Sequence, residues 1–146
     1  MGEPIAADHQ IIGTWRLTRF TEENLATGAV TFPFGPQPKA YVIYTAGCYV
    51  STIFTAAGRH APAIPQATDE EAVALYRSMV AFAGRYVFRG ETLIYYPEIS
   101  WNEAWNGTTQ ERRFVVDADR LEVASVPAVS TLTGAKTVFS LVWDRA

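Results

Sequence analysis

Polar and apolar residues alternate along most of the chain, beginning with the segment Ile12–Phe20. In this segment Trp15, Leu17 and Arg19 fall on one side of the backbone, and Thr14, Arg16, Thr18 and Phe20 fall on the other. Such alternation is typical of a β-strand with two different faces. Gly13 allows a tight turn or a close backbone approach, and the adjacent indole is large enough to plug one end of a small barrel.

Alternating segments separated by turn residues continue to the end of the sequence. They predict seven further main strands at residues 40–44, 49–55, 85–88, 92–96, 109–116, 120–125 and 136–144, and a short return strand at 29–32. Three prolines between Pro33 and Pro38 remove strand hydrogen-bond donors and predict an irregular loop. Consecutive hairpins favour an all-β fold, an antiparallel up-and-down barrel of eight to ten strands, because closure leaves no sheet edge exposed.

One segment departs from the β pattern. Thr68–Glu71 has the sequence of a capping box, and Gly84 supplies a C-terminal stop. Between them, apolar residues recur at spacings of three and four: Ala72, Leu75, Tyr76, Met79, Val80 and Phe82. The pattern predicts one α-helix at about residues 69–83, inserted between the third and fourth main strands. Its apolar face would cover the barrel, either as a fixed plug or as a portal lid.

Composition narrows the class of protein. A chain of 146 residues is expected to form one domain spanning 1–146, and its 13% aromatic content favours a β-rich fold. A net charge of −3 argues against nucleic-acid binding, and no apolar run approaches the ~20 residues of a membrane span. Met1–Gln10 lacks the basic and apolar regions of a secretory signal, and Cys48 is the single cysteine. We expect a cytoplasmic protein without membrane insertion, and a homodimer is compatible with the sequence.

Short motifs along nearly the whole chain match one family. They are Gly13-Thr-Trp-Arg-Leu17, Phe32-Pro-Phe-Gly-Pro36, Lys39-Ala-Tyr-Val-Ile-Tyr44, Gly47-Cys-Tyr-Val-Ser51, Ala83-Gly-Arg-Tyr86, Trp105-Asn-Gly107, Gln110-Glu-Arg-Arg-Phe114 and Leu141-Val-Trp-Asp-Arg145. With them the chain resembles the lipocalin-like domain family, short intracellular bacterial and fungal calycin-type barrels. The resemblance implies a cavity for an apolar or amphipathic small molecule. The signal peptide, disulfide and Thr-Asp-Tyr loop motif of secreted lipocalins are absent, and only Arg145 corresponds to the arginine that covers their first-strand tryptophan.

The strand at 109–116 supplies candidate polar groups for the barrel interior. Its alternation places Gln110, Arg112 and Phe114 on one face, and Phe114 favours the inside. By the same reasoning Ile94, Tyr96 and Glu98 share a face, so that Glu98 is the expected partner of Arg112. A buried guanidinium needs an anion or several acceptors. Two roles follow for these side chains. In the first, Arg112 and Gln110, assisted by Tyr96, hold a ligand carboxylate, enolate or carbonyl. In the second, Arg112 and Glu98 form a structural pair that closes the barrel floor.

Aromatic residues supply candidate contacts to an apolar ligand. Tyr49, Trp101 and Trp105 are the predicted ligand contacts, whereas Trp15 and Trp143 are expected in the core. His9 and His60 are the only histidines, and neither has a Cys, Asp or second His at metal-ligand spacing. No nucleophile elbow, phosphate-binding loop or dinucleotide fingerprint is present. We therefore expect neither a metal nor a cofactor.

Three functions are compatible with this pattern. The leading hypothesis is non-covalent binding of a small hydrophobic or aromatic molecule in the barrel, anchored by Arg112, Gln110, Tyr96 and Glu98. The second is a cofactor-free enzyme of secondary metabolism that cyclises, isomerises or dehydrates a substrate, with Glu98 and Arg112 as catalytic residues. The third is a barrel filled by its own side chains that acts as a protein-interaction module.

Overall fold

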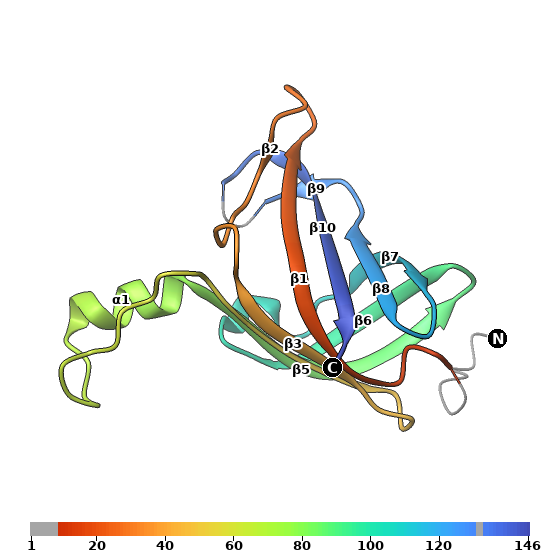
Figure 1. Cartoon of the computed structure of the whole chain (residues 1–146), viewed down its shortest axis with the longest axis horizontal. Coiled ribbons are helices and arrows are strands. Elements are labelled where there is room, and N and C mark those ends of the chain that lie inside the picture. The colour runs from red at the N-terminus through yellow and green to blue at the C-terminus, as the bar shows by residue number, and fades with distance from the viewer. Residues whose placement is uncertain (1–8, 131–132) are drawn as a thin grey trace.

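The strands form one antiparallel sheet that closes into a barrel, and the computed structural model describes residues 9–130 and 133–146 (Figure 1). Eight strands make up the barrel: β1 (Gly13–Asn24), β3 (Lys39–Tyr44), β4 (Tyr49–Thr55), β5 (Met79–Arg89), β6 (Thr92–Ser100), β7 (Gln110–Val116), β8 (Arg120–Ser125) and β10 (Lys136–Arg145). Each pairs with the next in this order, and β10 pairs with β1 to complete the circle. The predicted up-and-down barrel is confirmed.

Short elements extend the barrel at its loops. Two two-residue strands, β2 (Val30–Thr31) and β9 (Ala128–Val129), extend the sheet beside β1 and β10, and a 3₁₀ turn, η1 (Glu103–Trp105), follows β6. The segment 126–135, between the strands predicted at 120–125 and 136–144, therefore contains β9, and residues 131–132 lie outside the described residues. Most of Met1–Gln10, the segment considered for a secretory signal, also lies outside them.

Large side chains fill one end of the barrel. Trp15, Tyr44, Tyr86 and Leu121 are at most 1% exposed there, and Trp143 is 3% exposed, which confirms the core positions predicted for both tryptophans. Arg145 covers this end, with its guanidinium carbon 4.1 Å from the centre of a Trp15 ring. It also donates hydrogen bonds to the carbonyl oxygens of Gln10, Ile12 and Ala118. This end is closed to solvent.

The first strand contains an irregularity that the alternation did not reveal. The register with β10 shifts between Leu17 and Arg19, which marks a β-bulge. Because one extra residue is inserted, Phe20 turns into the core and is 7% exposed, while Arg19 lies on the surface. Trp15 and Leu17 share the inner face as predicted, but the prediction that Arg19 lies on the same face is wrong.

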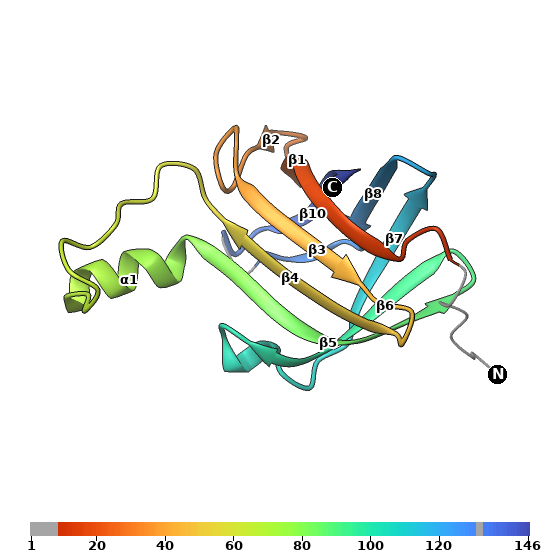
Figure 2. The ribbon, with the colours of Figure 1, turned by 60° about the horizontal axis from the view of Figure 1, so that its bottom comes forward.

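The inserted helix α1 (Asp69–Arg77) is shorter than predicted. Its capping box is confirmed, since the Thr68 side chain accepts from the Glu71 amide and the Glu71 carboxylate accepts from the Thr68 amide. The helix ends at Arg77, and Met79 begins β5, in which Val80 and Phe82 point into the barrel. No residue of α1 is buried, and the helix projects away from the barrel (Figures 1 and 2). The prediction of a fixed plug is wrong.

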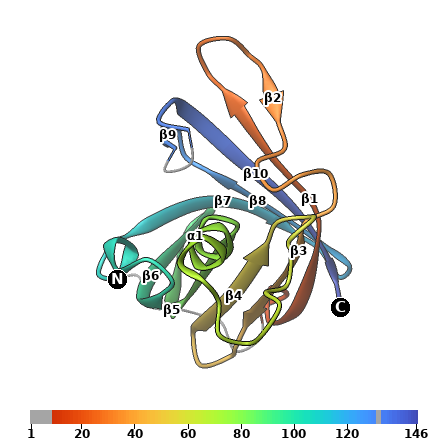
Figure 3. The ribbon, with the colours of Figure 1, turned by 90° about the vertical axis from the view of Figure 1, so that its left-hand side faces the viewer.

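The second end of the barrel lies at the opposite ends of the same strands. There β4 leads into the segment 56–68 and α1, β6 leads into η1, and β8 leads into β9. Figure 3 views the barrel from this side, with α1 in front of β4 and β5. The residues around this end belong to long connections rather than to tight hairpins, and the interior behind them is not filled.

Candidate functional site

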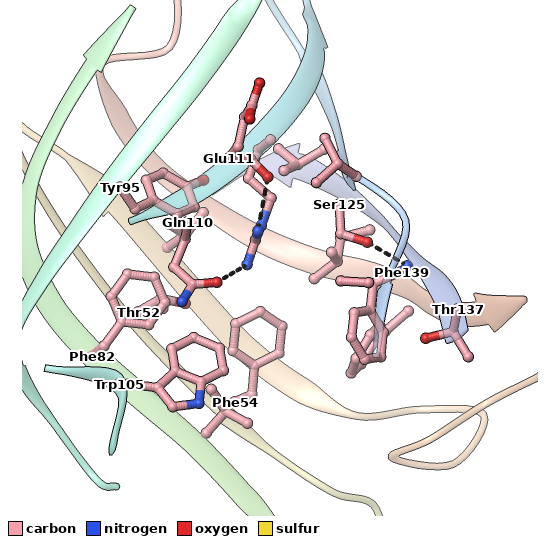
Figure 4. A pocket seen from close by; sticks show the side chains of 18 of the residues that line it. Thr52, Phe54, Phe82, Tyr95, Trp105, Gln110, Glu111, Ser125, Thr137 and Phe139 are labelled. Carbon is pink, nitrogen blue, oxygen red and sulfur yellow. Dashed lines mark hydrogen bonds between the residues drawn. The ribbon is translucent and has the colours of Figure 1, made fainter. Parts of the chain in front are cut away.

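A cavity of about 350 Å³ occupies the half of the barrel behind the long connections. Its wall is mostly apolar and comes from every barrel strand; the apolar residues are Phe20, Val42, Phe54, Val80, Phe82, Trp105, Val123, Val126, Ala128, Val129, Phe139, Leu141 and Trp143 (Figure 4). Ala128 and Val129 are exposed and lie on β9, at the outer end of this space. The volume lies in the range of small-molecule pockets, about 300–1,000 Å³.

Strand β7 brings two polar side chains into this apolar space. Gln110 pairs with Tyr95 of β6, and Arg112 pairs with Leu93, which is fully buried. Directly opposed residues of an antiparallel pair point to the same face. Gln110 and Arg112 therefore point inward and line the cavity, as the alternation of β7 predicted. Figure 4 shows the Gln110 amide close to Trp105.

Arg112 is a half-buried cation without a carboxylate partner. It donates hydrogen bonds to the carbonyl oxygen of Glu111 (2.9 Å) and to the Gln110 side-chain oxygen (3.5 Å), and it lies 5.7 Å from the centre of the Tyr95 ring. Within the described residues it forms no ion pair. Burial lowers the pKa of the guanidinium from its ordinary value, but an arginine still carries its charge near neutral pH. The cavity wall therefore carries a positive charge that has no ion-pair partner among the described residues, and the hydrogen bonds to Glu111 and Gln110 use two of its N–H groups.

Gln110 is held in a fixed orientation beside this charge. Its Nε2 donates to the Thr108 hydroxyl over 2.8 Å, and its Oε1 accepts from Arg112. The Thr108 hydroxyl in turn donates to the carbonyl oxygen of Trp105 over 2.6 Å. One short network thus joins both polar side chains of β7 to the loop that carries the Trp105 indole.

Glu98 does not lie beside Arg112, and the predicted pair between them is wrong. The inner face of β6 consists of Leu93, Tyr95 and Pro97, because Ile94 pairs with Glu111 on the outer face of β7. The register with β5 then shifts, so that Gly84 pairs with Pro97 and Ala83 with Ile99. Glu98 is the extra residue of this bulge, and it is exposed and absent from the cavity wall.

The remaining predicted site residues separate into two groups. Trp105 lines the cavity, and its ring lies 5.7 Å from that of Phe82. Tyr96, Tyr49 and Trp101 do not line it. Tyr96 and Tyr49 both pair with the β5 residue Arg85, which is exposed on the outer face, and Trp101 contacts Tyr76 and Trp105. Of the seven predicted ligand contacts, the structure brings Arg112, Gln110 and Trp105 together.

Sequence reasoning missed a pair of buried tyrosines behind Arg112. The hydroxyl groups of Tyr95 and Tyr44 form a 2.5 Å hydrogen bond, and the Tyr95 ring lines the cavity. Burial raises the pKa of both phenols, and for Tyr44 the neighbouring Tyr95 raises it further. The signal for Tyr95 was present in the sequence, because Leu93 and Tyr95 alternate as regularly as Ile94 and Tyr96.

We expect these phenols to make the protein sensitive to alkali. Burial also raises the pKa of Tyr86 to about 12, whereas tyrosines of an unfolded chain titrate near 10. Above pH ~10 the folded protein keeps the protons of these phenols, and the unfolded chain loses them. The free energy of unfolding therefore falls, for each buried tyrosine, by up to ~1.4 kcal/mol for each further pH unit. The stabilisation is complete below pH ~10 and is lost at higher pH.

Urea unfolding at pH 8 to 12, followed by tyrosinate absorbance, measures this effect. Tyr86→Phe should lower the slope of stability against pH by the contribution of one tyrosine. Tyr41 is exposed on the outside of the barrel, so Tyr41→Phe is the matched control. Titration of Tyr44, Tyr86 and Tyr95 near pH 10 without unfolding would contradict the expectation.

The described residues contain no group of three or more His, Cys, Asp or Glu side chains that could hold a metal ion. They also include no helix with the length and apolar character needed to cross a membrane.

A closed antiparallel barrel with an apolar cavity at one end and a tryptophan–arginine contact at the other defines a barrel of the lipocalin type. The family model described as a lipocalin-like domain matches residues 12–146. The chain therefore belongs to the lipocalin-like domain family, as its motifs predicted. No curated protein matches the sequence.

Proposed function

We propose that the protein binds a small apolar or aromatic molecule in the barrel cavity and that this molecule carries an anionic or carbonyl group. The observation that carries the proposal is Arg112, a cation in an apolar cavity without a carboxylate partner among the described residues. Keeping a charge in such an environment is costly unless an opposite charge or several acceptors meet it. A ligand with an anionic group supplies what the protein lacks.

The arrangement gives each part of such a ligand a place. Its polar group accepts charge-assisted hydrogen bonds from Arg112 and a hydrogen bond from the Gln110 amide. Its apolar body lies against the aromatic side of the cavity, formed by Phe54, Phe82 and Trp105. Polar groups that converge at one point of an apolar wall fix the orientation of a ligand. This division favours a flat or chain-like amphipathic molecule over a uniformly polar one.

Two observations favour binding over the other hypotheses. The open volume of about 350 Å³ supports a binding function over that of a filled barrel. Glu98, the candidate acid or base of the enzyme hypothesis, is exposed and outside the cavity wall. A general acid or base must come within hydrogen-bond reach of the substrate.

We expect filling the cavity to weaken binding. Anilinonaphthalene sulfonate, an aromatic anion that fluoresces in apolar surroundings, serves as the probe. Leu141→Trp adds bulk to the cavity wall and should weaken probe binding at least tenfold, because the volume that the rings occupy is lost. Ser140→Trp, on the exposed face of the same strand, is the matched control and should bind like the wild type. Thermal unfolding of each variant checks that the barrel is intact.

Equal binding in the wild type and both variants would place the probe outside the barrel and sink the proposal. Absence of saturable one-to-one binding to the wild type would do the same.

A further inference from the structure

We propose that two copies of this chain associate through the outer face of β3, β4 and β5, with the α1 helix of each copy lying on the other. This inference is independent of the proposed ligand, since it concerns the outside of the barrel. Figure 2 shows this face toward the viewer, with α1 extending past the ends of β4 and β5.

The outer face of these strands carries a continuous apolar patch. Its exposed residues are Tyr41 (48%), Ile43 (42%), Tyr49 (49%), Ile53 (56%) and, on the neighbouring β6, Ile99 (72%). Ile53 pairs with Tyr41 on one side and with Ala81 on the other. The adjacent row crosses four strands and consists of Ile43, Ser51, Ala83 and Ile99. We call the five exposed residues and the partners that connect them the outer patch. A continuous exposed patch of this kind marks an interaction surface.

Two arginines frame the outer patch without pairing with a carboxylate. The guanidinium of Arg16 lies 5.4 Å from the centre of the Tyr41 ring, and that of Arg85 lies 5.3 Å from the Tyr49 ring. Within the described residues neither takes part in an ion pair. Tyrosine and arginine are, with tryptophan, enriched among the residues that dominate the energy of protein interfaces.

Helix α1 presents the complementary surface. It has nine residues, none of them buried, and Val73 and Tyr76 are 48% and 46% exposed. An isolated helix shorter than ~12–15 residues is marginal in water, and helices in proteins gain most of their stability from packing an apolar face. The Tyr76 ring lies 6.4 Å from that of Trp101, between ring centres. Val73 and Tyr76 therefore leave an apolar side of the helix open to solvent.

The charges of the two surfaces indicate a second copy as the occupant. The first turn of α1 carries Asp69, Glu70 and Glu71, whereas Arg16 and Arg85 frame the outer patch. A two-fold contact uses the same surface of both copies, so each acidic helix meets the basic, aromatic face of its partner. Opposite charges steer such encounters and fix their register. One chain thus provides both halves of the interface.

The mass of the protein in solution tests the proposal. Sedimentation equilibrium over micromolar concentrations should give the wild type a mass of twice the 16.1-kDa chain. Ile53→Lys in the outer patch should weaken association at least tenfold, because it replaces an apolar contact within the patch with a charge that must lose its water on association. Val73→Lys on the projecting helix should act in the same direction. Val115→Lys is the matched control, because Val115 is 70% exposed on β7, away from the outer patch.

Each outcome decides the matter. A monomeric wild type overturns the proposal, as does a dimer that Ile53→Lys and Val73→Lys leave intact. Equal weakening by Val115→Lys also overturns it, because the effect would then come from added charge alone. Val73→Lys changes an exposed side chain with no core contact, so it remains informative if Ile53→Lys fails to fold. Probe binding in the cavity is measured on the same variants to test the proposed function separately. Loss or retention of probe binding does not change the conclusion about association.

Discussion

Replacing Arg112 by Met is expected to weaken the binding of an apolar carboxylate by about 10- to 100-fold. A hydrogen bond to a charged group contributes about 1.5–3 kcal/mol, and 1.4 kcal/mol corresponds to tenfold in affinity. Methionine keeps an apolar stem in the cavity but removes both the charge and the donors. Arg113, the next residue of β7, is exposed on the outer face and pairs with Thr92. Arg113→Met is therefore the matched control and should bind like the wild type.

Isothermal titration with a pair of ligands separates the charge from the shape. An arylalkyl carboxylate and the alcohol of the same skeleton are titrated at pH 7 into the wild type and both variants. The preference of the wild type for the carboxylate should disappear in Arg112→Met alone. An unchanged preference would contradict the role assigned to Arg112.

Stability distinguishes a ligand-binding arginine from a structural one. Among residues 9–130 and 133–146 the guanidinium donates only to Glu111 and Gln110, and a partly buried charge without an ion-pair partner contributes little to folding. Arg112→Met should therefore leave the unfolding midpoint in urea unchanged or raise it. A large fall in the midpoint would indicate that Arg112 holds the barrel together.

The alternation of β7 identified the polar side chains of the cavity because its two faces differ. Phe114 could be assigned to the interior, and Gln110 and Arg112 followed from a period of two. The closed end was equally accessible to sequence reasoning, since Trp15 and Arg145 belong to motifs of the family. On β7 a difference in polarity determined which side of the strand faces inward, and at the closed end the motifs supplied the same information.

The neighbouring strand could not be assigned in this way. Leu93 and Tyr95 on one face of β6 are as apolar as Ile94 and Tyr96 on the other, so two registers fitted equally well. The bulge at Glu98 then reversed the face of every residue after it, and nothing in the local sequence marks an inserted residue. The predicted Arg112–Glu98 pair failed for these two reasons.

The boundary between α1 and β5 failed because one set of residues satisfies two periods. Val80 and Phe82 continue a helical stripe from Leu75, but they also alternate as the inner face of a strand. Pairing decides between them, since Thr55, Phe54 and Ile53 of β4 pair with Met79, Val80 and Ala81. Tertiary contacts of this kind override a local helix signal, and the length of α1 follows from them.

Gly84→Ala is expected to lower the free energy of unfolding by about 3 kcal/mol or more, the largest stability effect that we anticipate from a single methyl group. A Cβ atom at this position would lie 2.0 Å from the carbonyl oxygen of Tyr96 and 3.0 Å from the amide nitrogen of Glu98. Both are backbone atoms of the paired strand, so neither can move aside as a side chain would. Gly84 is therefore needed for the close approach of β5 and β6 at the bulge, and it does not end a helix.

The same substitution reaches the cavity through the backbone of β6. Gly84 pairs with Pro97, whose carbonyl oxygen accepts a 2.9 Å hydrogen bond from the Gly107 amide and so holds the loop that carries Trp105. Separating β5 from β6 shifts this anchor, so Gly84→Ala should weaken probe binding as well as stability. Urea unfolding measures the first effect and fluorescence titration the second. Gly47→Ala, where the nearest atom to an added Cβ is 3.9 Å away, is the control and should change stability by no more than about 0.5 kcal/mol. Equal stability of the two alanine variants would show that β5 and β6 can separate at little cost, contrary to the tight approach at Gly84.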